Sequence, residues 1–495
     1  MSEGAGSGRH GFRRVLVANR GEIAARVIRT CRRLGIETVL TVSDADAGSL
    51  PARLADATIR IGPAAAAASY LDVDAVVGAA LAAGADALHP GYGFLSENPK
   101  LASACEKAGV VFIGPSAPTL EAAGDKLAAR DHAVAAGLSV LPGGHVLPDA
   151  TAAELAARVG FPVLVKAAGG GGGRGLRVVR EPGDLAHAVA VASAEAAAAF
   201  GDPRVYLERY VSPGRHVEVQ LLGDGERVIH LGDRDCSVQR RYQKLIEEAP
   251  APLLGGALRD GLAGAAVALG ERLRYRGAGT VEFLVDPTRD AFYFLEVNAR
   301  IQVEHPVTEA VTGVDLVAEQ IAIAEGRPLR LTQRDVTFTG HAIECRVNAE
   351  DPDDGFLPSP GTVTGAVFPA SGRGGVRVDT HVQAGAAVPP HYDSLLAKVI
   401  AHGADREHAL ARLRGALDRC EIGGVTTNLS MHRTLLADVE FARGGVDTGY
   451  LERVWPPATA ASAQYNTRYN TGAGAGAGAG TGPGTGTAGA GASHG

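Results

Sequence analysis

Short apolar runs alternate with amphipathic segments over residues 13–125. The run "RRVLVAN" (13–19) has the pattern of a buried strand, and "GEIAARVIRTCRRLG" (21–35) repeats its apolar positions with the period of a helix. Further short strands are expected at "ETVLTVS" (37–43), "DALHP" (86–90) and "VVFIG" (110–114). Strands that alternate with helices in this way predict a parallel sheet.

A glycine-rich loop, "KAAGGGGGRGLRVV" (166–179), lies between two further strand patterns. A dinucleotide fold or a P-loop would need a helix after the glycines, but here a strand follows. The loop is therefore predicted to cap a hairpin. Without Cβ atoms, its N–H groups could approach phosphate oxygens, with Lys166 adding a positive charge. The alternative is a flexible hairpin tip with no ligand.

Two more hairpins are expected further along the chain. In "VEVQLLGDGERVIHLGD" (217–233) an Asp-Gly turn separates two strand patterns. The segment "TVEFLVDPTRDAFYFLEVN" (280–298), centred near Arg289, places Glu282 directly opposite Glu296. Facing carboxylates are unfavourable unless a cation such as Mg²⁺ lies between them, and Asn298 is predicted on the same face. A solvated strand face with the register shifted by one residue is the alternative.

Alternation also predicts two polar rows. In an extended chain, five polar side chains would project to one side: Glu296, Asn298, Arg300, Gln302 and Glu304. A second row is formed by His216, Glu218 and Gln220 in "RHVEVQ". These rows offer metal ligands, an anion-binding group and a possible base, although a lone histidine such as His216 is more often structural.

Composition narrows the range of functions. The chain has 495 residues, a formal net charge of −7 and a sequence pI near 6.1, which argue against a nucleic-acid-binding surface. Neither a membrane-length apolar run nor a signal-peptide pattern is visible, and the five cysteines are scattered, so a cytoplasmic location is expected. Only six of the 48 basic residues are lysines, so each retained lysine is mildly informative.

Several motifs together resemble the biotin carboxylase family of ATP-grasp enzymes. They are "LVANRGEIAARVIRT", "HPGYGFLSEN", the glycine-rich loop, "RHVEVQ", "RDCSVQRRYQKLIEEAP", "FLEVNARIQVEHPVTE" and "GHAIECRVNAEDP", between Arg13 and Trp455. The resemblance implies an α/β fold with three domains: a parallel-sheet N-terminal domain at 13–125, an ATP-grasp domain at 126–330 with its lid at about 140–205, and a mixed α/β C-terminal domain at 335–455. The Gly/Ala/Thr-rich residues 456–495 are expected to form a disordered tail.

The resemblance also implies roles for individual residues. The nucleotide site would comprise Lys126, Lys166, Gly172, Gly173, Glu208, Arg209, Tyr210, Val211, His216, Tyr242, Glu282 and Glu296. Mg²⁺ or Mn²⁺, with two sites expected, would be held by Glu282, Glu296 and Asn298. Bicarbonate would be held by Lys244, Arg300 and the backbone of Val303, with Glu304 as the base. Biotin would lie near Arg346 and Tyr92. Tyr242 departs from the histidine or asparagine that is usual in the family.

The implied reaction is ATP- and bicarbonate-dependent carboxylation of biotin through carboxyphosphate. A biotin-accepting lysine lies between two methionines in many such enzymes, but this sequence has only Met1 and Met431, and no lysine after Lys398. Biotin is therefore expected on a separate carrier protein, with carboxyltransferase subunits as further partners and a homodimer as the assembly. The leading expectation is the biotin carboxylase subunit of acetyl-CoA carboxylase, in fatty acid biosynthesis. Alternatives are a pyruvate or urea carboxylase system, another ATP-grasp ligase, or a non-catalytic nucleotide-binding subunit.

Overall fold

The computed structural model describes residues 11–146, 152–167, 176–200, 202–372 and 374–455. The glycine-rich loop, including Gly172 and Gly173, and the predicted tail at 456–495 lie outside these residues. Among the residues described, no helix combines the length and the apolar character needed to cross a membrane.

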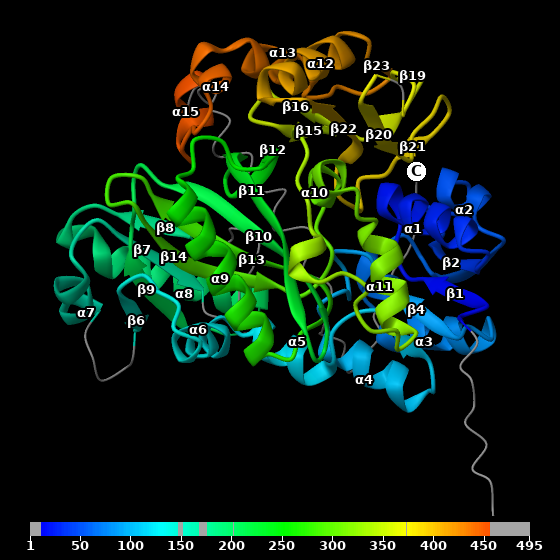
Figure 1. The fold of residues 1–495 in the computed structure, drawn as a ribbon, viewed down its shortest axis with the longest axis horizontal. Helices are drawn as coiled ribbons and strands as arrows, with labels where there is room; N and C mark the ends of the chain where they lie inside the picture. The colour runs from blue at the N-terminus through cyan, green and yellow to red at the C-terminus, as the bar shows by residue number, and fades with distance from the viewer. Residues whose placement is uncertain (1–10, 147–151, 168–175, 201, 373, 456–495) are drawn as a thin grey trace, which may run out of the picture.

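The N-terminal part forms a five-stranded sheet in the order β3-β2-β1-β4-β5 (Figure 1). All four strand pairings are parallel, which confirms the sequence prediction. The strands are β1 (Arg14–Val17), β2 (Glu37–Ser43), β3 (Ala57–Gly62), β4 (Ala87–His89) and β5 (Val111–Phe112). The helices are α1 (Gly21–Arg33), α2 (Leu50–Leu54), α3 (Val73–Ala82) and α4 (Pro99–Lys107). The Asn98 side chain caps α4, and Pro99 occupies its first turn.

A second, antiparallel sheet has the order β6-β9-β7-β8. Its strands are β6 (Gly143–His145), β7 (Val163–Ala167), β8 (Arg177–Val179) and β9 (Val205–Arg209). Four helices accompany it along the chain: α5 (Ala117–Gly124), α6 (Lys126–Ala135), α7 (Ala152–Val159) and α8 (Leu185–Phe200). Helices α7 and α8 pack on the sheet around a small apolar core. The antiparallel pairing of β7 with β8 confirms the hairpin that was predicted around the glycines.

The largest sheet has eight strands in the order β14-β13-β10-β11-β12-β15-β22-β20. These are β10 (Arg215–Asp224), β11 (Val228–Arg240), β12 (Gln243–Ala249), β13 (Arg276–Asp286), β14 (Ala291–Asn298), β15 (His341–Asn348), β20 (Val376–Thr380) and β22 (Leu395–Gly403). The β10–β11 hairpin confirms the prediction from the Asp-Gly turn. Because β12 pairs with β15, a single sheet crosses the domain boundary that was expected between residues 330 and 335.

Helices cover this sheet on both faces. Helix α9 (Gly256–Arg272) packs on β10 and β11, while α12 (Arg406–Asp418) packs on β15 and β22. Two helices, α10 (His305–Thr312) and α11 (Leu316–Ala324), connect the sheet to the N-terminal part, where α11 contacts α1. The chain's last described helices, α13 (Leu429–Ala437), α14 (Val439–Arg443) and α15 (Tyr450–Val454), lie at the top of Figure 1.

Short strand pairs complete the C-terminal part. They are β16 (Glu350–Asp351) with β17 (Leu357–Pro358), β18 (Gly361–Thr362) with β21 (Ala387–Val388), and β19 (Gly365–Val367) with β23 (Glu421–Gly423).

In the β13–β14 hairpin, the predicted pairing of Glu282 with Glu296 is confirmed, but the predicted uniform register is not. Glu282 is paired with Glu296, as expected, but the register shifts immediately afterwards, so that Phe283 pairs with Phe294 and Leu295 forms a bulge. A single uniform register was therefore wrong, although it gave the correct partner for Glu282.

The predicted extended row ending at Glu304 was also wrong. Strand β14 ends at Asn298, and Glu304 occupies the N-cap position of α10. Pro306 lies in the first turn of that helix, where its missing N–H costs nothing and its fixed φ favours the helical start. The chain therefore turns after Asn298, and the polar side chains of residues 300–304 reach the site from a turn.

Candidate functional site

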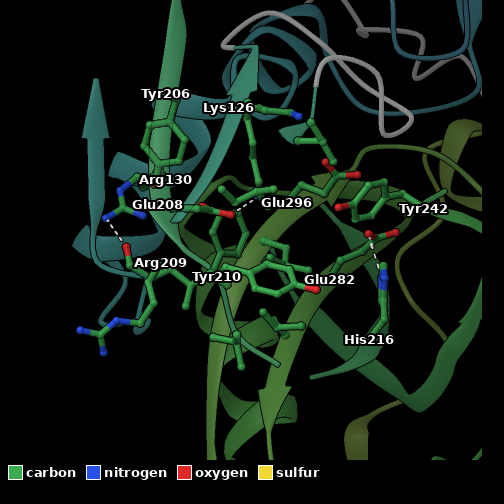
Figure 2. A pocket seen from close by; sticks show the side chains of 18 of the residues that line it. Lys126, Arg130, Tyr206, Glu208, Arg209, Tyr210, His216, Tyr242, Glu282 and Glu296 are labelled. Carbon is green, nitrogen blue, oxygen red and sulfur yellow. Dashed lines mark hydrogen bonds and ion pairs between the residues drawn. The ribbon is translucent and has the colours of Figure 1, made fainter. Parts of the chain in front are cut away.

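A pocket lies between the four-stranded sheet and the β13–β14 end of the large sheet (Figure 2). All ten described residues of the predicted nucleotide set line it: Lys126, Lys166, Glu208, Arg209, Tyr210, Val211, His216, Tyr242, Glu282 and Glu296. They come from α6, β7, β9, β10, β13, β14 and the turns after β9 and β11. Apolar side chains complete the wall, including Leu164, Leu176, Leu284 and Phe294. Such a wall suits a planar ring, and the charged residues suit phosphates.

Two lysines bring positive charge to the pocket. Lys126 is the first residue of α6, whose N-terminus is capped by the Asp125 side chain. Lys166, near the end of β7, forms an ion pair with Glu208 of β9. Burial lowers the pKa of Lys126, and the nearby Lys166 lowers it further, against the attraction of Glu296. An incoming anion would relieve this repulsion between the two ammonium groups.

Tyr242 stands at the pocket rim. It belongs to the turn between β11 and β12 and adopts a left-handed backbone conformation with φ of 66°. Its side chain is 45% exposed, so it has room to move against a ligand. Partial burial raises the pKa of Tyr242 to about 12, and the phenol is therefore neutral at physiological pH.

A row of charged residues crosses four adjacent strands below the pocket. Arg234 of β11 pairs with Glu218 of β10, Glu218 pairs with Glu282 of β13, and Glu282 pairs with Glu296 of β14. Three carboxylates side by side would repel one another without cations between them. Lys244 bridges Glu218 and Glu282, with Nζ–oxygen distances of 2.5 and 2.7 Å.

Glu282, Glu296 and Asn298 form the set predicted to bind a divalent cation. Asn298 Nδ2 donates to Glu282 Oε1 at 2.9 Å, and His216 Nε2 lies 3.0 Å from Glu282 Oε2. Burial opposes ionisation, but Lys244 and His216 outweigh it and hold the pKa of Glu282 well below its usual range. Two facing carboxylates and an amide supply the oxygen ligands that Mg²⁺ or Mn²⁺ prefers, so the residues fit such an ion.

Lys244 is the centre of a buried charge cluster. Besides Glu218 and Glu282, its Nζ donates to Glu304 Oε1 at 2.7 Å and to Gln302 Oε1 at 3.2 Å. Burial works against the ammonium, yet the three surrounding carboxylates raise the pKa of Lys244 well above its usual value. The ammonium is therefore permanently charged and is held in place by acceptors from three parts of the chain.

Arg346 joins this cluster from β15. Its guanidinium donates to Glu304 Oε2 at 2.8 Å and to Glu247 Oε1 at 2.5 Å. Both oxygens of Glu304 are thus occupied, by Lys244 and by Arg346. These cations outweigh burial and lower the pKa of Glu304, whereas burial raises the pKa of Glu247 to about 7 in spite of Arg346.

Arg300 lies between the carboxylate row and the N-terminal part. Its guanidinium donates to Asn298 Oδ1 at 2.9 Å and to Glu97 Oε2 at 2.8 Å. Glu97 also accepts from the Ala299 backbone N–H at 2.9 Å. Tyr92 and Val303 are connected through two other residues. Tyr92 donates its hydroxyl to Glu22, and Lys398 contacts both Glu22 and the Val303 carbonyl.

Most of the predicted site residues that the structure describes therefore fall into two adjoining groups that share Glu282: the pocket and the Lys244 cluster. Tyr92 and Val303 lie outside both groups and are connected through Glu22 and Lys398. Sequence reasoning missed Arg234, Glu247, Glu97, Glu22 and Lys398 as members of the site. The low lysine count was the one signal that pointed towards Lys398. The others are ordinary charged residues whose partners are distant in the sequence.

Three family models match the chain. They are "Biotin carboxylase, N-terminal domain" over residues 11–120, "Carbamoyl-phosphate synthase L chain, ATP binding domain" over 125–332, and "Biotin carboxylase C-terminal domain" over 344–453. Together they account for nearly all of the described residues.

Individual relatives agree with these models. Biotin carboxylase of Pseudomonas aeruginosa is 51% identical over 444 residues, which cover 89% of this chain and 98% of the relative. A pyruvate carboxylase subunit of Methanothermobacter thermautotrophicus is 48% identical over 445 residues, covering 89% and 90%. The biotin carboxylase domain dimer of Hydrogenobacter thermophilus 2-oxoglutarate carboxylase, solved with MgADP, ADP and bicarbonate, aligns with a TM-score of 0.87 and 43% identity, covering 91% of this chain and 100% of that one.

Proposed function

The chain belongs to the biotin carboxylase family of ATP-dependent ligases and has the ATP-grasp fold, and we propose that it carboxylates biotin on a separate carrier protein. One observation supports the proposal above all: Glu282 lines the nucleotide pocket and also contacts Lys244 in the buried cluster. A γ-phosphate in the pocket and an anion at Lys244 would therefore lie next to each other, as phosphoryl transfer requires.

We propose that the pocket holds ATP. Lys126 and Lys166 neutralise the phosphates, and the backbone N–H groups of Gly172 and Gly173 in the glycine-rich loop donate hydrogen bonds to them. Glu208, Tyr210, Val211 and Arg209 lie along the base; the Arg209 guanidinium donates to the Val159 carbonyl at 3.0 Å, so Arg209 contributes through its backbone. His216 and Tyr242 contact the rest of the nucleotide.

Glu282, Glu296 and Asn298 are proposed to hold Mg²⁺ or Mn²⁺. The bound ion supplies charge neutralisation at the phosphate oxygens. The protein's own contribution is to keep Glu282 ionised, which Lys244 and His216 achieve by lowering the pKa of Glu282 against the effect of burial.

Bicarbonate is proposed to bind at Lys244, Arg300 and the Val303 backbone N–H. Its negative charge competes with Glu304 for Lys244 and Arg346, and so raises the pKa of Glu304 towards a value suited to a base. Glu304 then accepts the bicarbonate proton. A bicarbonate oxygen bonds to the γ-phosphorus of ATP as the bond to the bridging oxygen breaks, which yields ADP and carboxyphosphate.

Carboxyphosphate then breaks into CO₂ and phosphate beside the biotin ring. The released phosphate accepts the proton of biotin N1, negative charge develops on the ureido oxygen, and N1 then bonds to the carbon of CO₂. Arg346, whose guanidinium is fixed by Glu247 and Glu304, is proposed to stabilise that oxygen, and Tyr92 is proposed to contact biotin.

We propose an acyl-CoA carboxylase, and specifically acetyl-CoA carboxylase, as the system in which this chain works. The near-complete match to a stand-alone biotin carboxylase favours it. The pyruvate carboxylase relative is nearly as similar and makes pyruvate the second candidate acceptor. A biotin carrier and carboxyltransferase subunits are the proposed partners. A homodimer is the proposed assembly, as in the 2-oxoglutarate carboxylase domain structure.

Two assays test the proposal. ADP formation from ATP should require bicarbonate and should increase on addition of free biotin; ADP formation that is independent of bicarbonate would overturn the function. The acceptor system is tested by comparing kcat/KM for two biotinylated carriers, one from an acetyl-CoA carboxylase and one from a pyruvate carboxylase. A clear preference for the pyruvate carrier would overturn the acyl-CoA proposal alone.

A further inference from the structure

Lys398 is a completely buried lysine that has no role in the proposed reaction. It lies on β22 with an exposed fraction of 0%. Its Nζ donates to the Val303 carbonyl oxygen at 2.8 Å and lies 3.1 Å from Glu22 Oε1 and 3.9 Å from Asp379 Oδ2. Removing an ammonium from water is costly, so the three oxygen partners around Lys398 must compensate for its burial.

These partners come from three parts of the chain that meet at Lys398. Glu22 belongs to α1 of the N-terminal part, Val303 precedes α10, and Lys398 and Asp379 are register partners on β22 and β20. Arg346 of β15 is the register partner of Lys398 on the other side. Lys398 is therefore adjacent to Arg346, the arginine proposed to stabilise the ureido oxygen of biotin. It is also adjacent to the turn that carries Glu304.

Two reacting groups depend on this contact. The Val303 carbonyl is part of the peptide unit that joins Val303 to Glu304, so the bond from Lys398 fixes the backbone of the proposed base. On the other side, Glu22 Oε1 also accepts the hydroxyl of Tyr92, the proposed biotin neighbour. Lys398 thus lies between the bicarbonate side of the site and the biotin side.

We propose that Lys398 is a positioning residue that holds the Glu304 backbone and the Tyr92 ring in a fixed relation to each other. This inference rests on the proposed function. Lysine suits the position because its compact ammonium reaches the Val303 carbonyl and Glu22 at once, while Asp379 is already paired with Arg377. The planar fork of arginine would displace at least one of these groups, and methionine would remove the cation beside Glu22.

A purely structural ion pair would behave differently. Its loss would lower the melting temperature but would leave the kinetic constants of the folded fraction unchanged. A positioning role predicts a change in the chemical step, because a displacement of about 1 Å can cost on the order of 100-fold in rate. It also predicts an unchanged KM for ATP, since Lys398 does not line the nucleotide pocket.

The test compares Lys398→Arg with Lys100→Arg, an exposed lysine on α4, in steady-state assays with ATP, bicarbonate and free biotin. We expect kcat of Lys398→Arg to fall on the order of 100-fold while its KM for ATP stays within about twofold, and Lys100→Arg to behave as wild type. Folded Lys398→Arg with wild-type kcat, or with a loss confined to KM for ATP, would overturn the positioning role.

A second variant covers the case in which Lys398→Arg does not fold. Tyr92→Phe removes only the hydroxyl that contacts Glu22. We expect kcat/KM for biotin to fall about tenfold, a typical effect of losing one hydrogen bond to a charged group. Unchanged biotin kinetics would overturn the coupling. Wild-type enzyme that shows no bicarbonate dependence would instead overturn the proposed function.

Discussion

The nucleotide pocket and the Lys244 cluster adjoin each other but are built differently. In the pocket, side chains such as that of Tyr242 are partly exposed, and among the residues that the structure describes Lys166 pairs with one carboxylate, Glu208. In the cluster, Lys244 has four acceptors and is only 10% exposed, and both oxygens of Glu304 are bound. Burial makes each electrostatic contact in the cluster stronger and each misplacement more costly.

The contrast predicts two kinds of response to substitution. Changes in the pocket should act mainly on KM for ATP or for the metal, because neighbouring side chains can adjust. Changes in the cluster should act on kcat, because its charges are fixed before the reaction begins and stabilise charge as it develops.

The largest expected effect on stability is at Glu248, which follows Glu247 on β12. Glu248 of β12 is buried and contacts His341 at 2.8 Å and Arg406 at 2.6 Å. Glu248→Gln should lower the free energy of unfolding by about 3 kcal/mol at neutral pH, because it leaves the half-buried Arg406 without the counter-charge of the buried Glu248. Chemical denaturation followed by circular dichroism measures this loss.

The stability difference between wild type and Glu248→Gln should depend on pH. Burial opposes ionisation of Glu248, but His341 and Arg406 outweigh it and lower its pKa below the unfolded value of about 4.3. The stabilisation is therefore present above that value and is lost as the pH falls through the folded pKa. The difference between wild type and Glu248→Gln should shrink in acid; a constant difference would mean that the charge is not responsible.

Lys244→Arg should have the largest effect on catalysis. The guanidinium keeps the charge but cannot fit among Glu218, Glu282 and Glu304 without displacing one of them. We expect bicarbonate-dependent turnover to fall on the order of 100-fold, with the Kd for ATP little changed by calorimetry. Lys107→Arg, at the end of α4, is the matched control. Near-normal turnover in Lys244→Arg would show that the cluster tolerates substitution as well as the pocket does.

Glu296→Gln should have an intermediate effect, which is confined to the affinity for the metal ion. The amide keeps the shape of the side chain but loses the charge that faces Glu282. We expect the Mg²⁺ concentration needed for half-maximal turnover to rise about tenfold, which is about 1.4 kcal/mol of ion binding. A titration of activity against Mg²⁺ measures it, and an unchanged midpoint would argue that Glu296 is not a ligand.

Tyr242→His should have the smallest effect. Tyr242 lies at the exposed rim of the pocket, and its phenol is neutral, so the change alters one contact to the nucleotide. We expect KM for ATP to change by less than about threefold, in line with one exposed hydrogen bond. A loss of kcat would place Tyr242 closer to the chemistry than its position indicates.

Much of this architecture could be predicted from the sequence because it depends on local patterns. The parallel N-terminal sheet, the hairpins and the opposition of Glu282 and Glu296 all follow from periodicity and turn residues. The Leu295 bulge could not be predicted, because the uniform register already satisfied the pattern around Glu282. The turn after Asn298 was missed because strand alternation continues through residues 299–303, although Pro306 marks the helix start.

Contacts between segments that are far apart in the sequence could not be predicted from it. Glu97 and Arg300 are 203 residues apart, and nothing in "SEN" identifies the partner of its glutamate. Lys398 and Glu22 meet only because β20 and β22 extend the large sheet towards α1. Residue identities can suggest which side chains are chemically competent, but tertiary packing decides which of them are held together.

In the proposed reaction, an anion bound at Lys244 attacks the phosphate of a nucleotide in the adjoining pocket. Bicarbonate labelled with oxygen-18 tests it most directly, by mass spectrometry of the phosphate released during turnover with free biotin. Attack by a bicarbonate oxygen predicts that each phosphate formed carries one labelled oxygen, since that oxygen stays on phosphorus when carboxyphosphate breaks down. Phosphate without label would mean that water attacks ATP, and would contradict the account.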